Sequence, residues 1–318
     1  MKKILSILCV VLMTSCSQEE IDLENPQVIT AGPVLEGGLL SFKDDKSFIK
    51  EYNLLTKLKS SNEVNSWIDS KGHSAFLNVS DSTQIKYDEV EQAKIIYSDA
   101  LKAILNFESK FKINGKILWL NESNLYLLSE NDLSKNLKEL KSSENSLEVY
   151  GRVIGIKDNR ATNTSRTILN ANRSKGWSYG YSYAGSDKRI DLTLFNETII
   201  LNGNLQSTKM FLKCQRLNKN CSFWKCRWNS DNGGVLYIKV GNQVNWNFNN
   251  NLNSYNSVYG YLLSDSNNTV LFADGVQPVG PFIPLADNFV TSSAVNVTLI
   301  NDNTLGNITT WTQILSWY

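Results

Sequence analysis

The spacing of the hydrophobic residues changes near the middle of the chain. Before residue 150, apolar positions recur every three or four residues, which is typical of one face of an amphipathic helix. This spacing predicts helices over 61–72, 88–107 and 133–140. Short strands are expected between the last two of these helices, because Asn114-Gly115 predicts a tight turn inside 112–120 and 124–128 alternates like a strand.

The second half of the chain alternates like strands throughout. Turn dipeptides such as Asn202-Gly203 and Asp274-Gly275 separate the runs, whose spacing of about ten residues predicts a β-sandwich or barrel. The fold class expected is therefore α+β, with a mixed first part and an all-β, sandwich-like second part. The alternating residues are Trp177, Tyr179, Tyr181 and Tyr183; Ile190, Leu192 and Leu194; Met210 and Leu212; Phe223; Trp246 and Phe248; and Val295 and Val297.

The charge of the chain changes at the same place. Residues 36–150 contain 15 lysines, no arginine and 18 acids, a net charge of −3, whereas residues 151–318 contain 15 basic residues and nine acids, a net charge of +6. A shift of this kind often marks a domain boundary. We expect a mixed α+β domain over 36–150 and a β-sandwich-like domain over 151–318.

The amino terminus has the order of a secretory signal. Lys2 and Lys3 precede an apolar run from Ile4 to Met13, which as a helix would span only about 15 Å, half of a bilayer core. A signal peptide is therefore favoured over a membrane-spanning helix. The run ends in Thr14-Ser15-Cys16, which resembles a bacterial lipoprotein box, and this predicts a signal peptide over 1–15 and a lipid on Cys16. The alternative is an ordinary signal peptide with a coincidental cysteine.

Residues 16–35 are expected to form an acidic tether. Glu19, Glu20, Asp22 and Glu24 follow the cysteine closely. An acidic stretch in this place resembles the surface-export signal of Bacteroidota lipoproteins. The localisation expected is the outer membrane, with the lipid anchor in the membrane and the protein facing the cell exterior.

Several stretches of the mature chain resemble a family of Bacteroidota surface lipoproteins to which no activity is assigned. The stretches are GGLLSFKDDKSF at 37–48, NSWIDSKGHSAF at 65–76, ILNFESKFKINGKILWL at 104–120 and FLKCQRLNKNCSFWKCRW at 211–228. The resemblance implies an α+β amino-terminal region and a β-rich carboxy-terminal region. It also implies a surface location, and it implies no chemistry.

Composition excludes several kinds of chemistry. The net charge of +1 argues against nucleic acid, so no nucleic-acid partner is expected. The single histidine, His73, removes most histidine-based catalysis. Gly176-Trp177-Ser178-Tyr179-Gly180 has the letters of a nucleophile elbow, but the elbow needs a helix after the serine and a histidine downstream. A strand pattern follows Ser178 and no histidine does, so Ser178 is not expected to be a nucleophile.

Three cysteines follow Cys16 in the mature chain. Cys214, Cys221 and Cys226 lack the short spacing of metal ligands, and we expect no metal and no cofactor. Export favours a disulfide. Three single pairings are open, as is a fully reduced state. A hairpin turning at Leu217-Asn218 would bring Cys214 opposite Cys221.

Two groups of side chains are candidates for ligand contact. The row Trp177, Tyr179, Tyr181 and Tyr183 is either sandwich core or a platform on which sugars stack. The segment from Lys209 to Arg227 carries six basic residues, no acid and interleaved aromatic residues, so it is either a ligand surface or the wet face of a hairpin. Even spacing puts Trp224, Cys226 and Trp228 on one strand face, which we expect to be the core face.

These features predict a surface-exposed, lipid-anchored protein without enzymatic activity that binds a glycan or a protein partner. A second hypothesis is a structural or interaction lipoprotein with no small ligand. A third is a glycosidase-like hydrolase, which needs only two carboxyl groups about 5–10 Å apart. Asp187, Asp191 and Glu197 are the acids that the strand-rich half offers for this chemistry.

Overall fold

The computed structural model describes one compact unit that starts at Gly32. The predicted signal peptide, Cys16 and most of the predicted tether lie outside the described residues. None of the helices in the described ranges is long and apolar enough to cross a membrane. The described ranges are 32–78, 95–154, 156–157, 174–183, 185–222, 225–231, 235–240, 244–248, 251–255, 260–263, 267–274, 288–300 and 309–316.

The two longest helices are defined by their caps. Helix α1 (Asp45–Leu55) begins at Asp44, whose carboxylate accepts from the Ser47 N–H while the Ser47 hydroxyl accepts from the Asp44 N–H. Helix α2 (Ser61–Lys71) ends at Gly72, which takes the left-handed conformation with φ 67°. The predicted helix over 61–72 is thus confirmed, whereas α1 was not predicted. The other helices are α4 (Asp99–Ile104), α5 (Leu137–Ser142) and the 3-10 turns Glu130–Asp132 and Glu144–Ser146.

The helix expected over 88–107 is confirmed only for Asp99–Ile104 among the residues that the structure describes. Residues Ile95–Ile96 form strand β3, and α4 starts only after Ser98, whose hydroxyl accepts from the Leu101 N–H at 3.1 Å. A side chain that caps a helix start cannot lie inside a longer helix, so the apolar spacing crossed a helix boundary. For the same reason α5 begins at Leu137, after its cap Asn136, rather than at residue 133.

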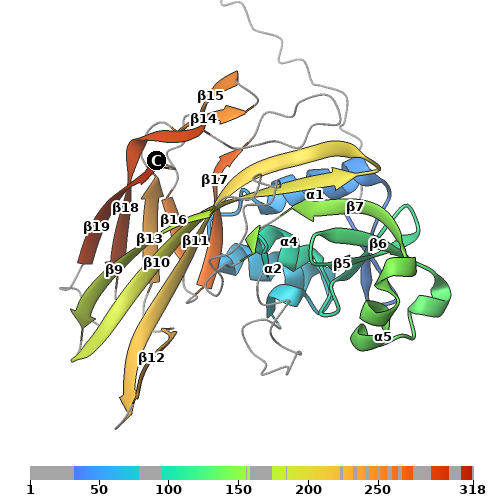
Figure 1. Cartoon of the computed structure of the whole chain (residues 1–318), viewed down its shortest axis with the longest axis horizontal. Coiled ribbons are helices and arrows are strands. Elements are labelled where there is room, and N and C mark those ends of the chain that lie inside the picture. The colour runs from blue at the N-terminus through green and yellow to red at the C-terminus, as the bar shows by residue number, and fades with distance from the viewer. Residues whose placement is uncertain are drawn as a thin grey trace, which may run out of the picture. The chain divides into compact units, whose positions relative to one another are not determined.

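A large sheet of eleven strands forms the main part of the fold (Figure 1). Its order is β1-β2-β4-β5-β6-β7-β10-β11-β12, with β9 also paired to β10 and β17 also paired to β11. The Asn114-Gly115 turn joins β4 to β5, and Asn202-Gly203 joins β10 to β11, with positive φ at all four residues. Both turns were predicted, as was the strand at 124–128. The strands are β1 (Val34–Glu36), β2 (Leu39–Phe42), β4 (Lys110–Ile113), β5 (Lys116–Asn121), β6 (Asn124–Leu128), β7 (Glu148–Ile154), β9 (Ser174–Tyr183), β10 (Ser186–Leu201), β11 (Asn204–Ser222), β12 (Lys225–Ser230) and β17 (Asn267–Asp274).

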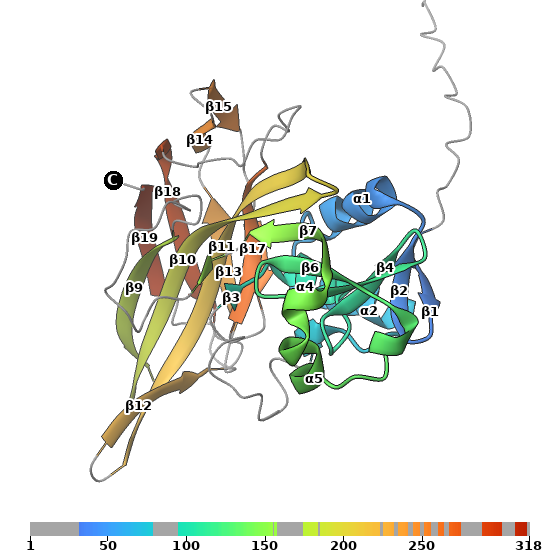
Figure 2. The same ribbon diagram turned by 45° about the vertical axis from the view of Figure 1, so that its right-hand side comes forward.

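A second sheet of six strands lies beside β9–β11, on the side away from α1 and α2 (Figures 1 and 2). Its order is β15-β14-β18-β13-β16, with β19 paired to β18. A fold that is mostly β-sheet with a few helices confirms the α+β class in outline. The strands are β13 (Val235–Val240), β14 (Val244–Phe248), β15 (Asn251–Tyr255), β16 (Gly260–Leu263), β18 (Asn288–Ile300) and β19 (Thr309–Ser316), and a separate pair joins β3 to β8 (Ile156–Lys157).

One hydrophobic core includes residues from both sides of residue 150. Phe48 and Leu101 of the helices pack in the same cluster as Phe195 and Phe211 of the long strands. Phe195 and Phe211 are opposite each other in register, and their rings stack with centroids 5.6 Å apart. The helices therefore cover one face of β10 and β11. The division into two domains at residue 150 stays a prediction, but the core does not stop there.

A buried carboxylate lies inside this core. Glu197 of β10 has no exposed surface, and its Oε1 accepts from the Tyr52 hydroxyl at 2.7 Å and from the Ser98 hydroxyl at 2.6 Å. Its Oε2 accepts from the Ser98 N–H at 2.7 Å. Burial raises the pKa of Glu197, and the hydrogen bonds from Ser98 and Tyr52 oppose that rise. One side chain thus ties α1 and the start of α4 to the sheet.

The raised pKa of Glu197 makes stability depend on pH. The fold disfavours the ionised form, so stability is highest below the ordinary glutamate pKa and is lost as pH rises through the raised one, by about 1.4 kcal/mol per pH unit between the two values. Chemical denaturation across this range should show less loss for Glu197→Gln, whose amide keeps an acceptor for Ser98. The exposed control Glu148→Gln should follow the wild type. Identical pH dependence in wild type and Glu197→Gln would contradict this account.

Candidate functional site

The predicted aromatic row faces the second sheet. Trp177, Tyr179 and Tyr181 are each half-buried on β9, and the side chain of Tyr183 lies outside the described residues. Tyr179 stacks on Tyr181 with ring centroids 6.0 Å apart and on Trp311 of β19 at 5.3 Å. Trp311 itself is 9% exposed. The row therefore contributes to packing between the sheets and does not form an open platform.

The letters of the nucleophile elbow lie on the other face of the same strand. Gly176, Ser178 and Gly180 are exposed and alternate with the aromatic residues. The Ser178 hydroxyl donates to Asp191 Oδ1 at 2.7 Å on the neighbouring strand β10. Ser178 is thus in the middle of a ten-residue strand, with no sharp turn and no helix after it. The motif reflects alternation between a wet face and a packed face.

The three candidate carboxylates do not form a glycosidase pair. All lie on β10, and at about 3.3 Å per residue Asp187 and Asp191 are about 13 Å apart, with Glu197 about 20 Å further on. These separations exceed the 5–10 Å that the chemistry requires. Asp187 accepts from Lys219 at 3.0 Å and Asp191 from Arg189 at 2.9 Å. The lysine lowers the pKa of Asp187.

The pairing of Cys214 with Cys221, one of the possibilities left open by the sequence, does not form. The structure pairs Cys221 with Cys226 and leaves Cys214 as a buried thiol, 2% exposed, whose pKa is raised by burial. The reason is the position of the turn. Strand β11 continues to Ser222, so Cys214 and Cys221 lie seven residues apart on one strand, about 23 Å. Cys221 instead faces Cys226 across the β11–β12 pair.

The end of the β11–β12 pair extends beyond the rest of the sheet (Figure 1). We call it the arm, and it comprises 218–222 and 225–230; Phe223 and Trp224 between them lie outside the described residues. Every side chain described from 220 to 222 and from 226 to 230 is exposed, on both faces of the ribbon. These side chains therefore add nothing to the hydrophobic core.

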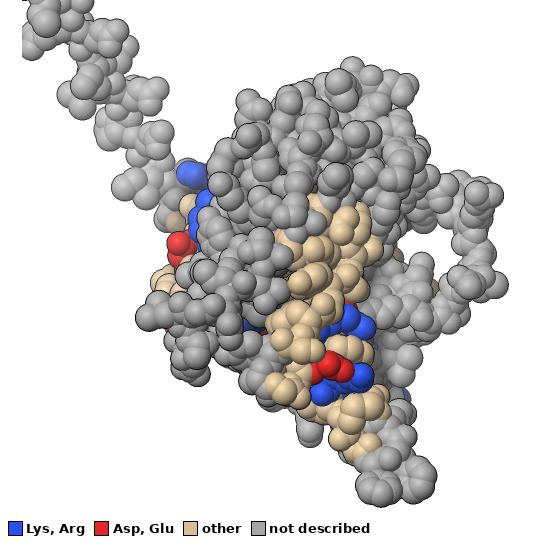
Figure 3. Space-filling view, turned by 90° about the vertical axis from the view of Figure 1, so that its left-hand side faces the viewer, with Lys and Arg blue, Asp and Glu red and all other residues tan. Residues whose placement is uncertain are grey.

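Trp228 is exposed to solvent, contrary to the prediction that its strand face packs in the core. It is 38% exposed, and the Arg189 guanidinium lies 4.6 Å from the centre of its ring. The tryptophan escapes burial because its strand lies past the part of the sheet that the other layers cover. Figure 3, which views the side carrying β9 and β12, shows basic and acidic side chains gathered together.

The other face of the arm carries hydrogen-bonding groups around a shallow recess. Asn220 is opposite Arg227, and Asn229 and Ser222 follow on the same face, two residues away along each strand. Together with Cys221 they line an open recess of about 450 Å³. Amide, hydroxyl and guanidinium groups are thus presented without a carboxylate. The basic character of this segment was predicted, whereas Asn220 and Asn229 were missed.

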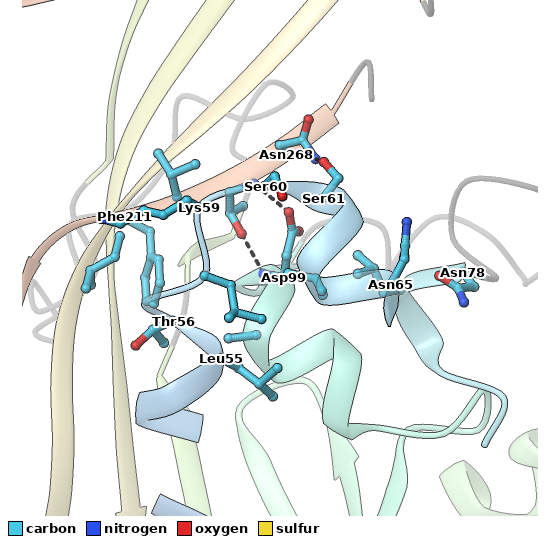
Figure 4. A pocket seen from close by; sticks show the side chains of 17 residues that line it. Leu55, Thr56, Lys59, Ser60, Ser61, Asn65, Asn78, Asp99, Phe211 and Asn268 are labelled. Atoms are coloured by element: carbon cyan, nitrogen blue, oxygen red, sulfur yellow. Dashed lines mark hydrogen bonds between the residues drawn. The ribbon is translucent and has the colours of Figure 1, made fainter. Parts of the chain in front are cut away.

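A second recess lies between α2, the start of α4 and β17 (Figure 4). Its volume is about 260 Å³. Asn268 Nδ2 donates to the Ser61 hydroxyl at 2.8 Å, and Asp99 Oδ2 accepts from the Thr269 N–H at 2.7 Å while the Asp99 N–H donates to the Thr269 hydroxyl. These bonds fasten β17 to the helices. The polar lining therefore has a structural role.

The described residues offer no alternative centre for metal or histidine chemistry. No group of three or more His, Cys, Asp or Glu side chains in the described ranges could hold a metal ion. His73 is buried beside Trp67, with Nε2 2.8 Å from the Ala103 carbonyl oxygen, and burial lowers its pKa.

Comparison with protein-family models, with curated proteins and with solved structures finds no match to this chain. The resemblance to surface lipoproteins therefore stays a prediction.

Exposure of Trp228 predicts a small cost for its removal. Trp228→Ala should lower the free energy of unfolding by about 0.5–1 kcal/mol, because the main loss is the contact with Arg189. Phe211→Ala, which empties a core position 1% exposed, should cost about 3–5 kcal/mol. Urea titrations of both variants compare the two losses. An equal loss of unfolding free energy in the two variants would contradict this account, because it would mean that Trp228 is buried like Phe211.

Proposed function

We propose that this protein is a non-catalytic binding protein, held at the outer surface of the cell by a lipid on Cys16, and that its arm contacts an anionic glycan. The observation that carries the proposal is an arm that is exposed on both faces and presents hydrogen-bonding and cationic groups without an acid. Exposed amide, hydroxyl and guanidinium groups of this kind can make hydrogen bonds and ion pairs with an acidic sugar.

The arm is held in one conformation despite its exposure. A two-stranded ribbon with no hydrophobic face is marginally stable in water by itself. Here the Cys221–Cys226 disulfide closes its far end. At its base Asp231 accepts from Lys188 at 2.7 Å, and the Asp231 N–H donates to the Arg216 carbonyl at 3.0 Å. A ribbon ordered in advance loses little entropy on binding, as a recognition element requires.

The chemistry of the arm favours an acidic sugar. Residues 218–230 contain Lys219, Lys225 and Arg227 and no acid; Lys219 is paired with Asp187 of β10, so the charge beside the recess is that of Arg227. The Arg227 guanidinium can bind a carboxylate or sulfate through two parallel hydrogen bonds. Asn220, Asn229 and Ser222 beside it offer donors and acceptors for sugar hydroxyl groups. An acidic sugar would be attracted by the positive charge of Arg227, whereas a neutral protein surface would not be.

Two further parts of the hypothesis fit this reading. The stacking of Tyr179 on Trp311 supports a sandwich of the two sheets, with the aromatic row as its packing. The wide spacing of Asp187, Asp191 and Glu197 disfavours a glycosidase built on these acids. Binding without hydrolysis is therefore the function that these residues support best.

The arm should determine glycan binding. On an array of neutral and acidic glycans, the unit from Gly32 to Tyr318 should bind uronic-acid or sulfated glycans. Arg227→Ala should weaken that binding about 10- to 100-fold, because a hydrogen-bonded charge is removed. Asn229→Ala should weaken it less. Interferometry with the best glycan gives the affinities.

The matched control is Arg152→Ala, which removes an exposed arginine from β7. It should leave glycan affinity unchanged. Equal affinity of Arg227→Ala and wild type would move the site away from the arm. Absence of any glycan ligand would contradict the proposal and favour a protein partner.

A further inference from the structure

A shallow basic groove follows the outward face of α1. Lys46, Lys50 and Lys57 line it together with Asn53 and Leu54, and Gln206 of β11 forms its far side. The groove is open, with a volume of about 720 Å³. At 3.6 residues per turn Lys46 and Lys50 fall within one narrow sector of the helix, and Lys57 follows two residues after its last residue, Leu55. The opposite sector holds Phe48, Tyr52 and Leu55 in the core.

The acids of α1 point elsewhere. Asp45 accepts from the Tyr150 hydroxyl at 2.6 Å, on the side of the helix that faces the sheet. Glu51 accepts from Trp67 Nε1 at 2.7 Å, on the side that faces α2. The described lining of the groove therefore contains three lysines and no carboxylate. Such a surface attracts an anionic partner.

The shape of this surface fits a broad anionic plane better than an enclosed ligand. Lysine is a flexible point charge, suited to phosphates spread over a surface, whereas bidentate recognition favours arginine. Leu54 lies among the lysines and is 47% exposed, so it can enter the boundary between headgroups and acyl chains. Lysines on the exposed face of a helix also add electrostatic attraction to anionic lipids.

The chain enters the described unit beside this helix. A Cβ added to Gly32 would lie 3.0 Å from Lys71 Nζ and 4.0 Å from Glu51 Oε2, so residue 32 is next to α1 and α2. Cys16 precedes it by sixteen residues, which reach at most about 58 Å when extended. A lipid on Cys16 would keep the α1 end within that distance of the membrane.

The groove and the arm are joined by one strand. Gln206 and Asn220 both belong to β11 and are fourteen residues apart, about 45 Å at the usual rise per residue. Figures 1 and 2 both show α1 and β12 at opposite ends of the long strands. If one end rests on the membrane, the other points away from it.

We propose that the basic groove along α1, lined by Lys46 and Lys50 of the helix and by Lys57 just beyond its end, docks onto the anionic headgroups of the membrane that holds the lipid anchor. This inference rests on the lipid anchoring proposed above, and it adds an orientation. The docked helix holds the protein with its arm directed outward, toward an external glycan. Each lysine near an anionic surface strengthens binding about fivefold, so three provide roughly a hundredfold.

Vesicle sedimentation tests the docking without the lipid. The unit from Gly32 to Tyr318 should bind phosphatidylcholine vesicles that contain one third phosphatidylglycerol, and not pure phosphatidylcholine vesicles. High salt should abolish the binding, because screening weakens exposed charges. The triple variant Lys46→Gln, Lys50→Gln, Lys57→Gln should bind the anionic vesicles roughly 100-fold more weakly.

The matched control changes three lysines on other elements: Lys116→Gln, Lys138→Gln and Lys141→Gln. It should bind vesicles within a few-fold of wild type, and unfolding curves should show both triple variants folded. Equal binding by the two triple variants, or no binding of wild type to anionic vesicles, would overturn the proposal. Binding to heparin but not to vesicles would mean that the face takes an acidic polymer.

The outcome is separate from that of the glycan proposal. Arg227→Ala should bind anionic vesicles like wild type, and the α1 triple variant should bind the array glycan like wild type. A loss of vesicle binding in Arg227→Ala would assign vesicle binding to the arm and overturn the docking of α1.

Discussion

The carboxylate of Glu197 is the point at which the two layers of the core depend on each other. A charge-bearing group without exposed surface is tolerated only when hydrogen bonds replace its water, and here those bonds come from Tyr52 on α1 and from Ser98 at the start of α4. Loss of the helices would leave the carboxyl group without partners. Loss of the strand would leave the Ser98 hydroxyl and N–H without their acceptor.

This constraint fixes the position of the helices along β10, and therefore along β11. The helices cover the first part of β11, and its middle packs between layers. Its end extends past the hydrophobic core and becomes the arm. One strand thus passes from a basic helix face at one end to an exposed ribbon at the other. In the proposed orientation, a membrane contact and a glycan contact are kept apart by the length of that strand.

The features that could be predicted from the sequence are those with local causes. Asn114-Gly115 and Asn202-Gly203 accept positive φ and so specified two hairpins, and Gly72 ended α2. Alternation identified β9 to β11. Helix α1 had an equally local signal, because its buried residues follow the cap Asp44 at helical spacing, but it was not predicted. The buried residues are Phe48, Ile49, Tyr52 and Leu55.

The features that were predicted wrongly depend on contacts between residues far apart in the sequence. Ser98 starts α4 because its hydroxyl caps that helix and also donates to Glu197, about a hundred residues away, which no spacing reveals. The cysteine pairing depended on whether β11 turns at residue 217 or continues to 222. Burial of Trp228 depended on where the other layers end. The lysines of the α1 groove are present in the sequence, but their position along one groove could not be predicted without helix α1.

The most direct test of the account is the distance between its two surfaces. Spin labels on Lys50→Cys and Asn220→Cys, in the unit from Gly32 to Tyr318, report the separation of the groove from the arm; Cys214 is buried and Cys221 and Cys226 are bonded. The account predicts one narrow distance distribution at the separation of about 45 Å between Gln206 and Asn220 along β11, because Gln206 lines the same groove as Lys50. A broad distribution, or a main distance below about half of that value, would contradict the claim that one core and one strand hold the two surfaces at opposite ends.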